Sequence, residues 1–125
     1  MVETIFKESY RHPEFERDLK QLTKKFRSLP DDLETFIKFS LNSFHHLNQN
    51  QDGIEHIAGL GIEYPKVYKV TKFSCKALKG RGAKSGIRVI YAYFLDKDRV
   101  EFVEMYFKAD QENEDRSRIT KLYKK

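Results

Sequence analysis

The chain has 125 residues, of which 39% are hydrophobic and 34% charged, and its formal net charge is +5. This length fits a single domain, residues 1–125, with one modest core to which ten Phe and seven Tyr contribute much of the buried area. No run of about 18 apolar residues is present, so we expect no transmembrane helix and no membrane partner. No secretory signal is visible, and Cys75 is the only cysteine, so a cytoplasmic location is the simplest expectation.

The N-terminal half predicts a strand followed by two amphipathic helices. Residues 4–10 alternate well enough for a strand. The first helix begins near Pro13, which the first helical turn tolerates, and its apolar face repeats at helical spacing: Phe15, Leu19, Leu22 and Phe26. A second helix begins near Asp31, a candidate N-cap with Glu34 three residues on. Its expected buried face comprises Leu33, Phe36, Ile37, Ser40, Leu41, Phe44 and Leu47.

The C-terminal half predicts three strands and a last helix. Residues 48–53 form a polar loop, and residues 54–62 are expected to be irregular because glycines interrupt them. Strands are expected over 67–75, 87–95 and 100–107, and a tight turn makes the last two an antiparallel hairpin. The strand 87–95 is apolar on both faces, which is typical of a central strand.

A final polar helix follows, with Asp110 as its candidate N-cap. The predicted order is therefore β-α-α-β-β-β-α. This order predicts an α+β fold, in which the N-terminal helical hairpin packs on one face of a small, mostly antiparallel sheet.

Positive charge is concentrated in the second half of the chain. The window from Lys66 to Leu95 contains eight basic residues and no acidic one, whereas the rest of the chain has a net charge of −3. The eight are Lys66, Lys69, Lys72, Lys76, Lys79, Arg81, Lys84 and Arg88. A basic field on one face or rim of a sheet favours a phosphate-rich partner.

Three segments, in this order, resemble the RelE/ParE superfamily, the toxins of type II toxin–antitoxin systems. Residues 6–22 are similar to the family's first strand and first helix. Residues 85–91, Ser-Gly-Ile-Arg-Val-Ile-Tyr, resemble its central strand, where a glycine and an arginine precede an apolar run. Residues 106–108 lie where members carry a basic or histidine-containing element. The segment 48–62 makes this chain longer than many members, and the C-terminal half lacks the histidine that several ribonuclease members use.

The resemblance implies a hydrolase that needs neither metal nor cofactor: an mRNA interferase that cleaves messenger RNA on the ribosome and inhibits translation. It also implies a cognate antitoxin protein that holds the toxin inactive. Two alternatives remain open. One is a ParE-like toxin that binds DNA gyrase and has no nuclease activity. The other is an inactive, basic RNA-binding module of the same fold.

Metal-free RNA cleavage requires a proton acceptor for the 2′-hydroxyl, a positive group for the phosphorane and a proton donor for the leaving oxygen. Four residues are candidates for these catalytic roles: Arg88 to hold phosphate bidentately, Arg81 to flank the scissile strand, Lys108 as acid or base, and Tyr106 to donate a proton or stack a base. The candidate RNA-binding residues are Lys72, Lys76, Lys79, Lys84 and Tyr93. Tyr123 lies near the C-terminus, where members of the resembled family sometimes have a functional tyrosine.

Each assignment has a structural alternative. Arg88 can pair with a carboxylate of the fold, the loop lysines can be merely solvated, and both Tyr93 and Tyr106 can serve packing. Cys75 is expected to be a buried structural thiol. No metal site is expected, because the four histidines lack ligand partners at suitable spacing: His12, His45, His46 and His56.

Overall fold

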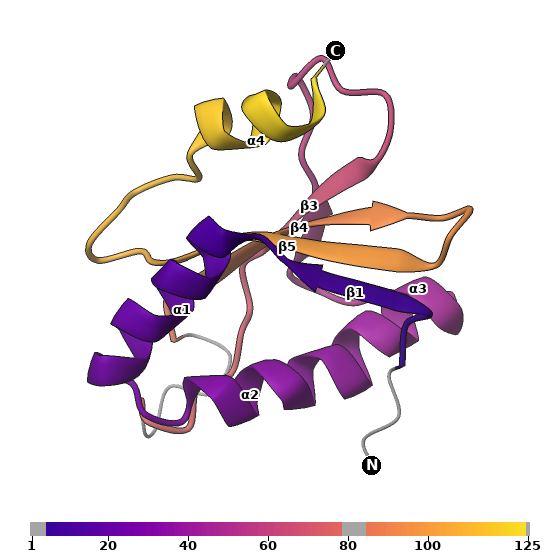
Figure 1. Ribbon diagram of the computed structural model, residues 1–125. Helices are drawn as coiled ribbons and strands as arrows, with labels where there is room; N and C mark the ends of the chain where they lie inside the picture. The colour runs from indigo at the N-terminus through magenta and orange to yellow at the C-terminus, as the bar shows by residue number, and fades with distance from the viewer. Residues whose placement is uncertain (1–4, 79–84, 125) are drawn as a thin grey trace.

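A computed structural model describes residues 5–78 and 85–124 of the chain, which form a five-stranded mixed sheet with helices on both faces (Figure 1). Three of the helical segments, α2, the π-helical turn η1 and α3, follow one another without interruption. In chain order the elements are β1 (Glu8–Arg11), α1 (Pro13–Lys25), α2 (Leu29–Phe36), η1 (Ile37–Leu41), α3 (Asn42–His46), β2 (Ile54–His56), β3 (Lys66–Val70), β4 (Ile87–Phe94), β5 (Arg99–Phe107) and α4 (Arg116–Tyr123).

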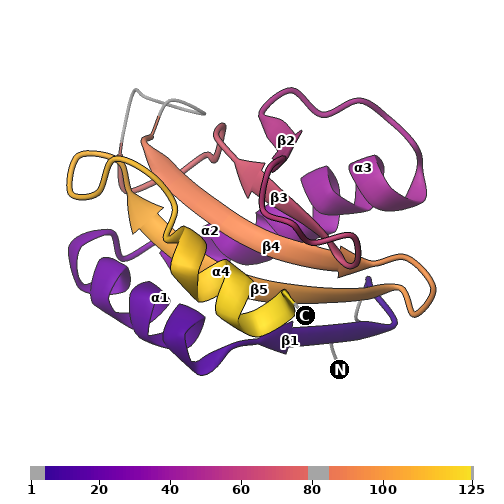
Figure 2. The ribbon, with the colours of Figure 1, turned by 90° about the horizontal axis from the view of Figure 1, so that it is seen from above.

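The strand order in the sheet is β1-β5-β4-β3-β2. β1 runs parallel to β5, and the other neighbours are antiparallel. β4 lies in the middle of the sheet (Figure 2), as its two apolar faces predict. The α+β class is therefore confirmed, and so is the packing of the N-terminal helices on one face of the sheet.

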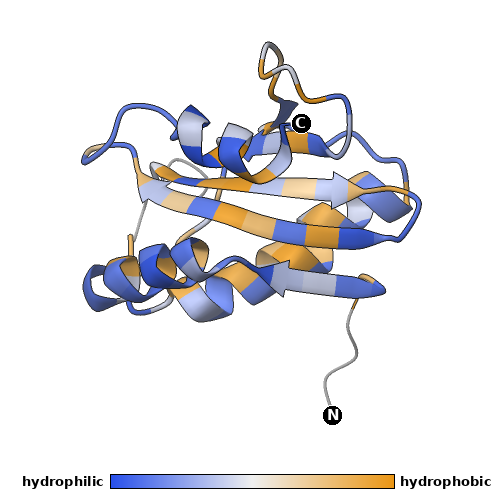
Figure 3. Ribbon diagram, turned by 45° about the horizontal axis from the view of Figure 1, so that its top comes forward, coloured by the Kyte–Doolittle hydropathy of each residue, from blue (hydrophilic) through white to orange (hydrophobic). Residues whose placement is uncertain are grey.

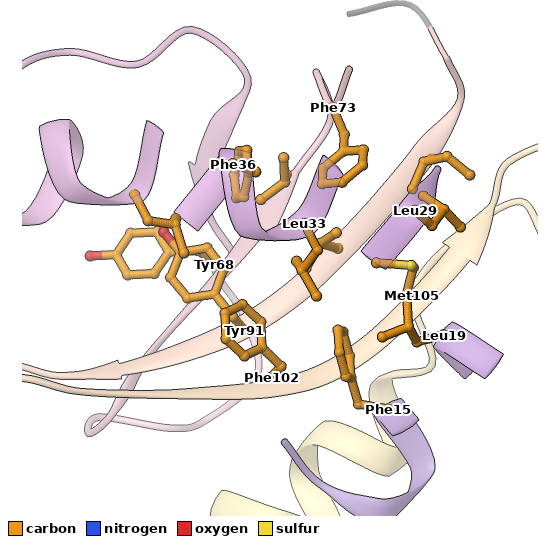
Figure 4. Close-up of a cluster of buried hydrophobic side chains, with 14 of the residues drawn as sticks. Phe15, Leu19, Leu29, Leu33, Phe36, Tyr68, Phe73, Tyr91, Phe102 and Met105 are labelled. Carbon is orange, nitrogen blue, oxygen red and sulfur yellow. The ribbon is translucent and has the colours of Figure 1, made fainter. Parts of the chain in front are cut away.

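The sheet separates two apolar clusters. On one side, side chains of α1 and α2 pack against Tyr91 and Phe102 (Figure 4). On the other side, Ile119 of α4 packs against Ile90 and Val103. Apolar and polar residues alternate along the strands, as the orange and blue bands in Figure 3 show. This alternation decides which strand residues reach each face.

A β-bulge in β5 changes that alternation. The register between β4 and β5 shifts between Ile90 and Tyr91, so that Tyr106 lies opposite Arg88 and Glu101 lies opposite Ala92. Glu101 and Tyr106 are five positions apart, and strict alternation would place them on opposite faces. The extra residue in the bulge puts both on the face covered by α4.

One sequence prediction about the sheet is wrong. Residues 54–56 were expected to be irregular, but they form β2 and pair antiparallel with β3. Gly53 makes this possible, because it adopts a φ of 92°, which few other residues accept, and its carbonyl accepts a hydrogen bond from the Thr71 N–H. Ile54 is then buried against the core.

Several element boundaries also differ from those predicted. The strand predicted over 67–75 ends at Val70, and the strand predicted over 4–10 is Glu8–Arg11 within the described residues. The second helix begins at Leu29 rather than near Asp31, with the next residue, a proline, accommodated in its first turn. The last helix is capped by Asp115, which accepts from the Arg118 N–H, rather than by Asp110. None of the helices in the described ranges is long and apolar enough to cross a membrane.

Candidate nucleic-acid interface

Arg88, Tyr106 and Lys69 come together on the α4 face of the sheet. Arg88 in β4 pairs directly with Tyr106 in β5. Lys69 in β3 pairs with Ile90, which lies two residues beyond Arg88 and is buried beneath α4. Directly paired residues share a face, and so do residues two apart. We call these three residues the Arg88 cluster.

Arg88 carries a positive charge that has no carboxylate partner within the described residues. Its guanidinium donates to the Thr71 carbonyl oxygen at 2.8 Å and is half-buried. The alternative in which Arg88 pairs with a carboxylate is not observed in residues 5–78 and 85–124. The remaining guanidinium N–H groups are therefore suited to bind an anion such as phosphate.

Lys69 has a carboxylate partner. Its ammonium lies 2.9 Å from Glu114, and Arg116 lies 3.2 Å from the other oxygen of the same carboxylate. Burial would lower the pKa of Lys69, but the hydrogen bond that Lys69 donates to Glu114 and the nearby Tyr106 hydroxyl outweigh this effect, and the pKa of Lys69 is raised. Lys69 thus stays charged and is unsuited to accept a proton.

Tyr106 is 4% exposed, and its hydroxyl is buried without a hydrogen-bond partner among the described residues. Burial raises the pKa of Tyr106, and the Lys69 ammonium opposes that effect. Buried polar atoms are nearly always satisfied, and an unsatisfied hydroxyl costs about 1–3 kcal/mol. The Tyr106 hydroxyl is therefore buried with no partner among the described residues that meets strict hydrogen-bond geometry, but it lies close enough to the Lys69 ammonium to be affected by its charge and by a weak hydrogen bond.

The other candidates from the sequence are not brought into this cluster. Lys108 is exposed just beyond the end of β5, and Lys72 is paired with Asp52 at the surface. Lys76 is exposed, and its backbone N–H donates to Asp32 in the first turn of α2. The remaining three candidates lie outside the described residues: Lys79, Arg81 and Lys84.

Tyr93 lies on the opposite face of the sheet, in the core with α1 and α2, and is 7% exposed. Its ring stacks on His45 at a centroid distance of 4.0 Å, and its hydroxyl donates to Asp98 at 2.7 Å. This burial supports the packing role of Tyr93 and leaves no room for a base to stack on the ring. The burial of Cys75 likewise agrees with a structural thiol.

A second polar cluster on the α4 face lies where β1 leads into α1. His12 Nε2 lies 2.9 Å from a carboxylate oxygen of Glu101 and 3.0 Å from the Tyr123 hydroxyl. Tyr123 donates to the same Glu101 oxygen at 2.7 Å, and Arg99 donates to the other oxygen at 2.7 Å. We call these four residues the His12 cluster.

The Glu101 carboxylate in this cluster is ionised. Burial would raise the pKa of Glu101, but the hydrogen bonds from Arg99, Tyr123 and His12 outweigh it and lower the pKa. Burial and the adjacent Glu101 carboxylate raise the pKa of Tyr123, which therefore keeps its proton. The cluster thus combines an imidazole, a fixed negative charge and a neutral phenol.

The sequence gives only a partial signal for the His12 cluster. Glu101 stands out as a charged residue within an apolar strand, and Tyr123 was already a candidate. His12 has no potential partner nearby in the sequence, because Glu101 is 89 residues away. The contact depends on the parallel pairing of β1 with β5, in which Tyr10 aligns with Glu101.

A third cluster ties α3 to the turn between β4 and β5. His46 Nε2 lies 2.6 Å from Asp98, which also accepts from the Tyr93 hydroxyl and from the Lys7 N–H at 3.1 Å. Burial would raise the pKa of Asp98, but these donors outweigh burial, and the pKa of Asp98 is lowered.

His45 is neutral at pH 7, because burial and the neighbouring His46 lower the pKa of His45 to about 4. Among the described residues, no group of His, Cys, Asp and Glu side chains has an arrangement that would hold a metal ion.

Comparison with protein-family models, curated proteins and solved structures gave no significant match.

Proposed function

We propose that this protein is a metal-independent endoribonuclease of the RelE type, which cleaves messenger RNA on the ribosome and thereby inhibits translation. The proposal is supported chiefly by Arg88, whose half-buried guanidinium has no carboxylate partner among the described residues and lies on the same face of the sheet as Lys69. A phosphate has acceptor oxygens for both cations. It would accept from the free N–H groups of Arg88.

In this proposal the Arg88 cluster grips the RNA backbone. Arg88 binds a phosphate through its remaining N–H groups and Lys69 adds positive charge, while the buried Tyr106 packs beside them. The pKa of Lys69 and that of Tyr106 are both raised. Neither group therefore accepts a proton readily near neutral pH, and the cluster binds rather than performs acid–base chemistry.

That property also favours a second candidate function, the inactive RNA-binding module of the same fold. It would use the same cluster to bind RNA and would cleave nothing. A gyrase-binding toxin is the third possibility raised by the resemblance, and no contact in the described residues favours it. The three functions predict different outcomes for RNA cleavage, RNA binding and gyrase-dependent DNA breaks, so a single set of assays distinguishes them.

The test is a cell-free translation reaction programmed with one transcript, in which cleavage is mapped with and without ribosomes engaged on the message. We expect ribosome-dependent cleavage by the wild-type protein and a loss of about 10- to 100-fold in kcat/KM in Arg88→Ala, because a hydrogen bond to a charged group contributes about 1.5–3 kcal/mol. Lys38→Ala, which removes an exposed cation of η1, is the control. RNA binding without cleavage would favour the inactive module, and gyrase-dependent DNA breaks would favour the third function.

We also propose a cognate antitoxin that binds through an acidic, amphipathic segment. The exposed side of α1 supports this, because its basic residues recur at helical spacing beside a shallow groove of about 690 Å³ that reaches Pro30. The basic residues lining the groove are Arg17, Lys20, Lys24 and Arg27. An acidic helix would complement their charge and pack its apolar face into the groove.

A further inference from the structure

The proposed cleavage requires a group that takes the proton from the attacking 2′-hydroxyl, and the Arg88 cluster does not supply one. We propose that His12 is this general base and that Glu101 is the residue that positions it. The inference rests on the proposed ribonuclease function. It names a catalytic residue that the resemblance does not indicate.

The geometry fixes which nitrogen of His12 carries a proton. Glu101 is an ionised carboxylate and only accepts hydrogen bonds, so the Nε2 atom, 2.9 Å from it, must be the N–H donor. In the neutral imidazole, Nδ1 then has a free lone pair. Serine hydrolases use the same division of labour, in which a buried carboxylate holds the tautomer and the other nitrogen accepts the proton.

The Nδ1 atom is also available to a ligand. It has no hydrogen-bond partner among the described residues, whereas Nε2 has two neighbours within 3.0 Å. The His12 side chain keeps 16% of its surface exposed. His46, by contrast, bonds through both nitrogens, to Asn42 and to Asp98.

A pocket adjoins the His12 cluster through Tyr123. Its volume is about 260 Å³, and residues 61–64 form the rest of its lining. This volume lies below the range of about 300–1,000 Å³ that accommodates drug-sized ligands, so the pocket suits a smaller group such as one nucleobase. Tyr64 in its wall is 47% exposed and offers an aromatic face on which a base can stack. We infer that the nucleotide carrying the attacking hydroxyl binds here.

The two clusters act on different parts of one RNA strand. Glu101 and Tyr106 are five positions apart along β5, which corresponds to about 15 Å. One phosphate cannot contact both clusters, but a bound single strand covers on the order of 4–16 nucleotides. Arg88 therefore grips a phosphate some nucleotides away from the bond that is cleaved next to His12.

The chemical step is a transesterification. The 2′-oxygen gives its proton to His12 Nδ1 and forms a bond to phosphorus, while the bond from phosphorus to the 5′-oxygen breaks. The departing 5′-oxygen takes a proton from water. His12 then returns its proton to the hydroxide that remains, so the products are a 2′,3′-cyclic phosphate and a 5′-hydroxyl end, and no oxidant or reductant is required.

The test compares His12→Ala and Glu101→Gln with the wild-type protein in the ribosome-dependent cleavage reaction. We expect kcat to fall 10²- to 10⁴-fold in His12→Ala, the usual contribution of general acid–base catalysis, with little change in KM. Glu101→Gln keeps the shape of the side chain, but its amide can donate to Nε2 and favour the wrong tautomer, so kcat should fall in this variant as well. Added imidazole should restore part of the His12→Ala rate.

The controls separate catalysis from folding. His56→Ala removes an exposed histidine from β2, and Glu8→Gln removes the other carboxylate partner of Arg99 without a contact to His12. Both should retain wild-type rates. Substituted imidazoles of equal size but different basicity should rescue His12→Ala to different rates. If added imidazole only filled the space left by the His12 side chain, these rates would be equal.

The inference fails on its own if wild-type protein cleaves RNA and His12→Ala, shown to be folded by thermal unfolding, cleaves within threefold of it. A folded Glu101→Gln variant with wild-type kcat also refutes the positioning role, even where His12→Ala does not fold. If the wild-type protein cleaves no RNA, the proposed function fails and the assignment of His12 falls with it.

Discussion

Replacing Tyr106 by Phe should stabilise the protein. The substitution removes only the hydroxyl, which is buried without a partner in the described structure. An unsatisfied buried polar group costs about 1–3 kcal/mol, and Phe fits the same volume without that cost. We therefore expect Tyr106→Phe to raise the free energy of unfolding by about 1–2 kcal/mol.

For a domain of 125 residues this gain should appear as a rise in Tm of roughly 4–8 °C. Urea unfolding should show a higher midpoint with an unchanged m-value, because the surface exposed on unfolding is the same. In the cleavage assay the same variant should keep most of its activity, since the buried hydroxyl is out of reach of an RNA phosphate. Most substitutions at buried sites destabilise, so stabilisation here would be specific to the unpaired hydroxyl.

The opposite result would refute this reasoning. Lys69 lies close enough to Tyr106 to oppose the rise in its pKa. If the Lys69 ammonium in fact donates to the hydroxyl, Tyr106→Phe should destabilise the protein by about 0.5–1.5 kcal/mol, the usual contribution of a hydrogen bond. The Tyr106 hydroxyl would then be paired within the fold and would not be an unsatisfied group. Tyr10→Phe, an exposed tyrosine of β1, is the control and should leave Tm within about 1 °C.

Three further predictions follow from individual contacts. Glu114→Gln removes the negative charge that neutralises Lys69, so RNA binding should tighten and become more salt-dependent, which binding assays at several salt concentrations would detect. The pKa of Asp98 is lowered in the folded state from its usual 3.8, so the ionised Asp98 stabilises the fold fully above about pH 4, and this stabilisation is lost as the pH falls through the folded-state pKa. Asp98→Asn should therefore lose less stability than the wild-type protein in acid unfolding. An equal loss would contradict the stabilising role of the Asp98 carboxylate. Gly53→Ala should lower stability by about 1–3 kcal/mol in urea unfolding, because φ is 92° and the added Cβ would lie 2.6 Å from the Cβ of Lys72.

Local patterns in the sequence predict the parts of the fold that depend on local periodicity. The helical repeat correctly predicts that Phe15 and Leu19 form the buried face of α1 and that Phe26, the residue after the helix, is buried as well. The two apolar faces of β4 correctly predict its central place in the sheet. In both cases the pattern is local. Burial of one face gives α1 a repeat of about 3.6 residues, and burial of both faces gives β4 a continuous apolar run.

The features that the sequence does not predict depend on long-range pairing. β2 forms because Gly53 permits a left-handed turn and β3 offers an unpaired edge, and neither condition can be recognised in residues 54–62 alone. The contact between His12 and Glu101 requires both the parallel pairing of β1 with β5 and the bulge that turns Glu101 toward α4. A single-residue change in register would place Glu101 on the other face.

The strand register also changes what the basic window of the sequence means for binding. Lys69 and Arg88 face α4, whereas Lys66 pairs with Tyr93 and so belongs to the opposite face. The positive charges of the described window are therefore divided between the two faces, whereas the sequence predicted a basic field on one face or rim of the sheet. Recognition of RNA must depend on the placement of a few cations rather than on the total charge.

This division can be tested through the salt dependence of single-stranded RNA binding. Each phosphate that a protein neutralises on a single strand contributes about 0.7 to the slope of log K against log salt concentration. Lys69 and Arg88 alone would give a slope of about 1.4, and replacing both by Met should remove that amount. A slope near 5 in the wild-type protein that survives this double substitution would mean that other cations bind the RNA, and the Arg88 cluster would then have no special part in it. A slope that falls to near zero would show instead that the two cations on the α4 face supply nearly all of the electrostatic binding.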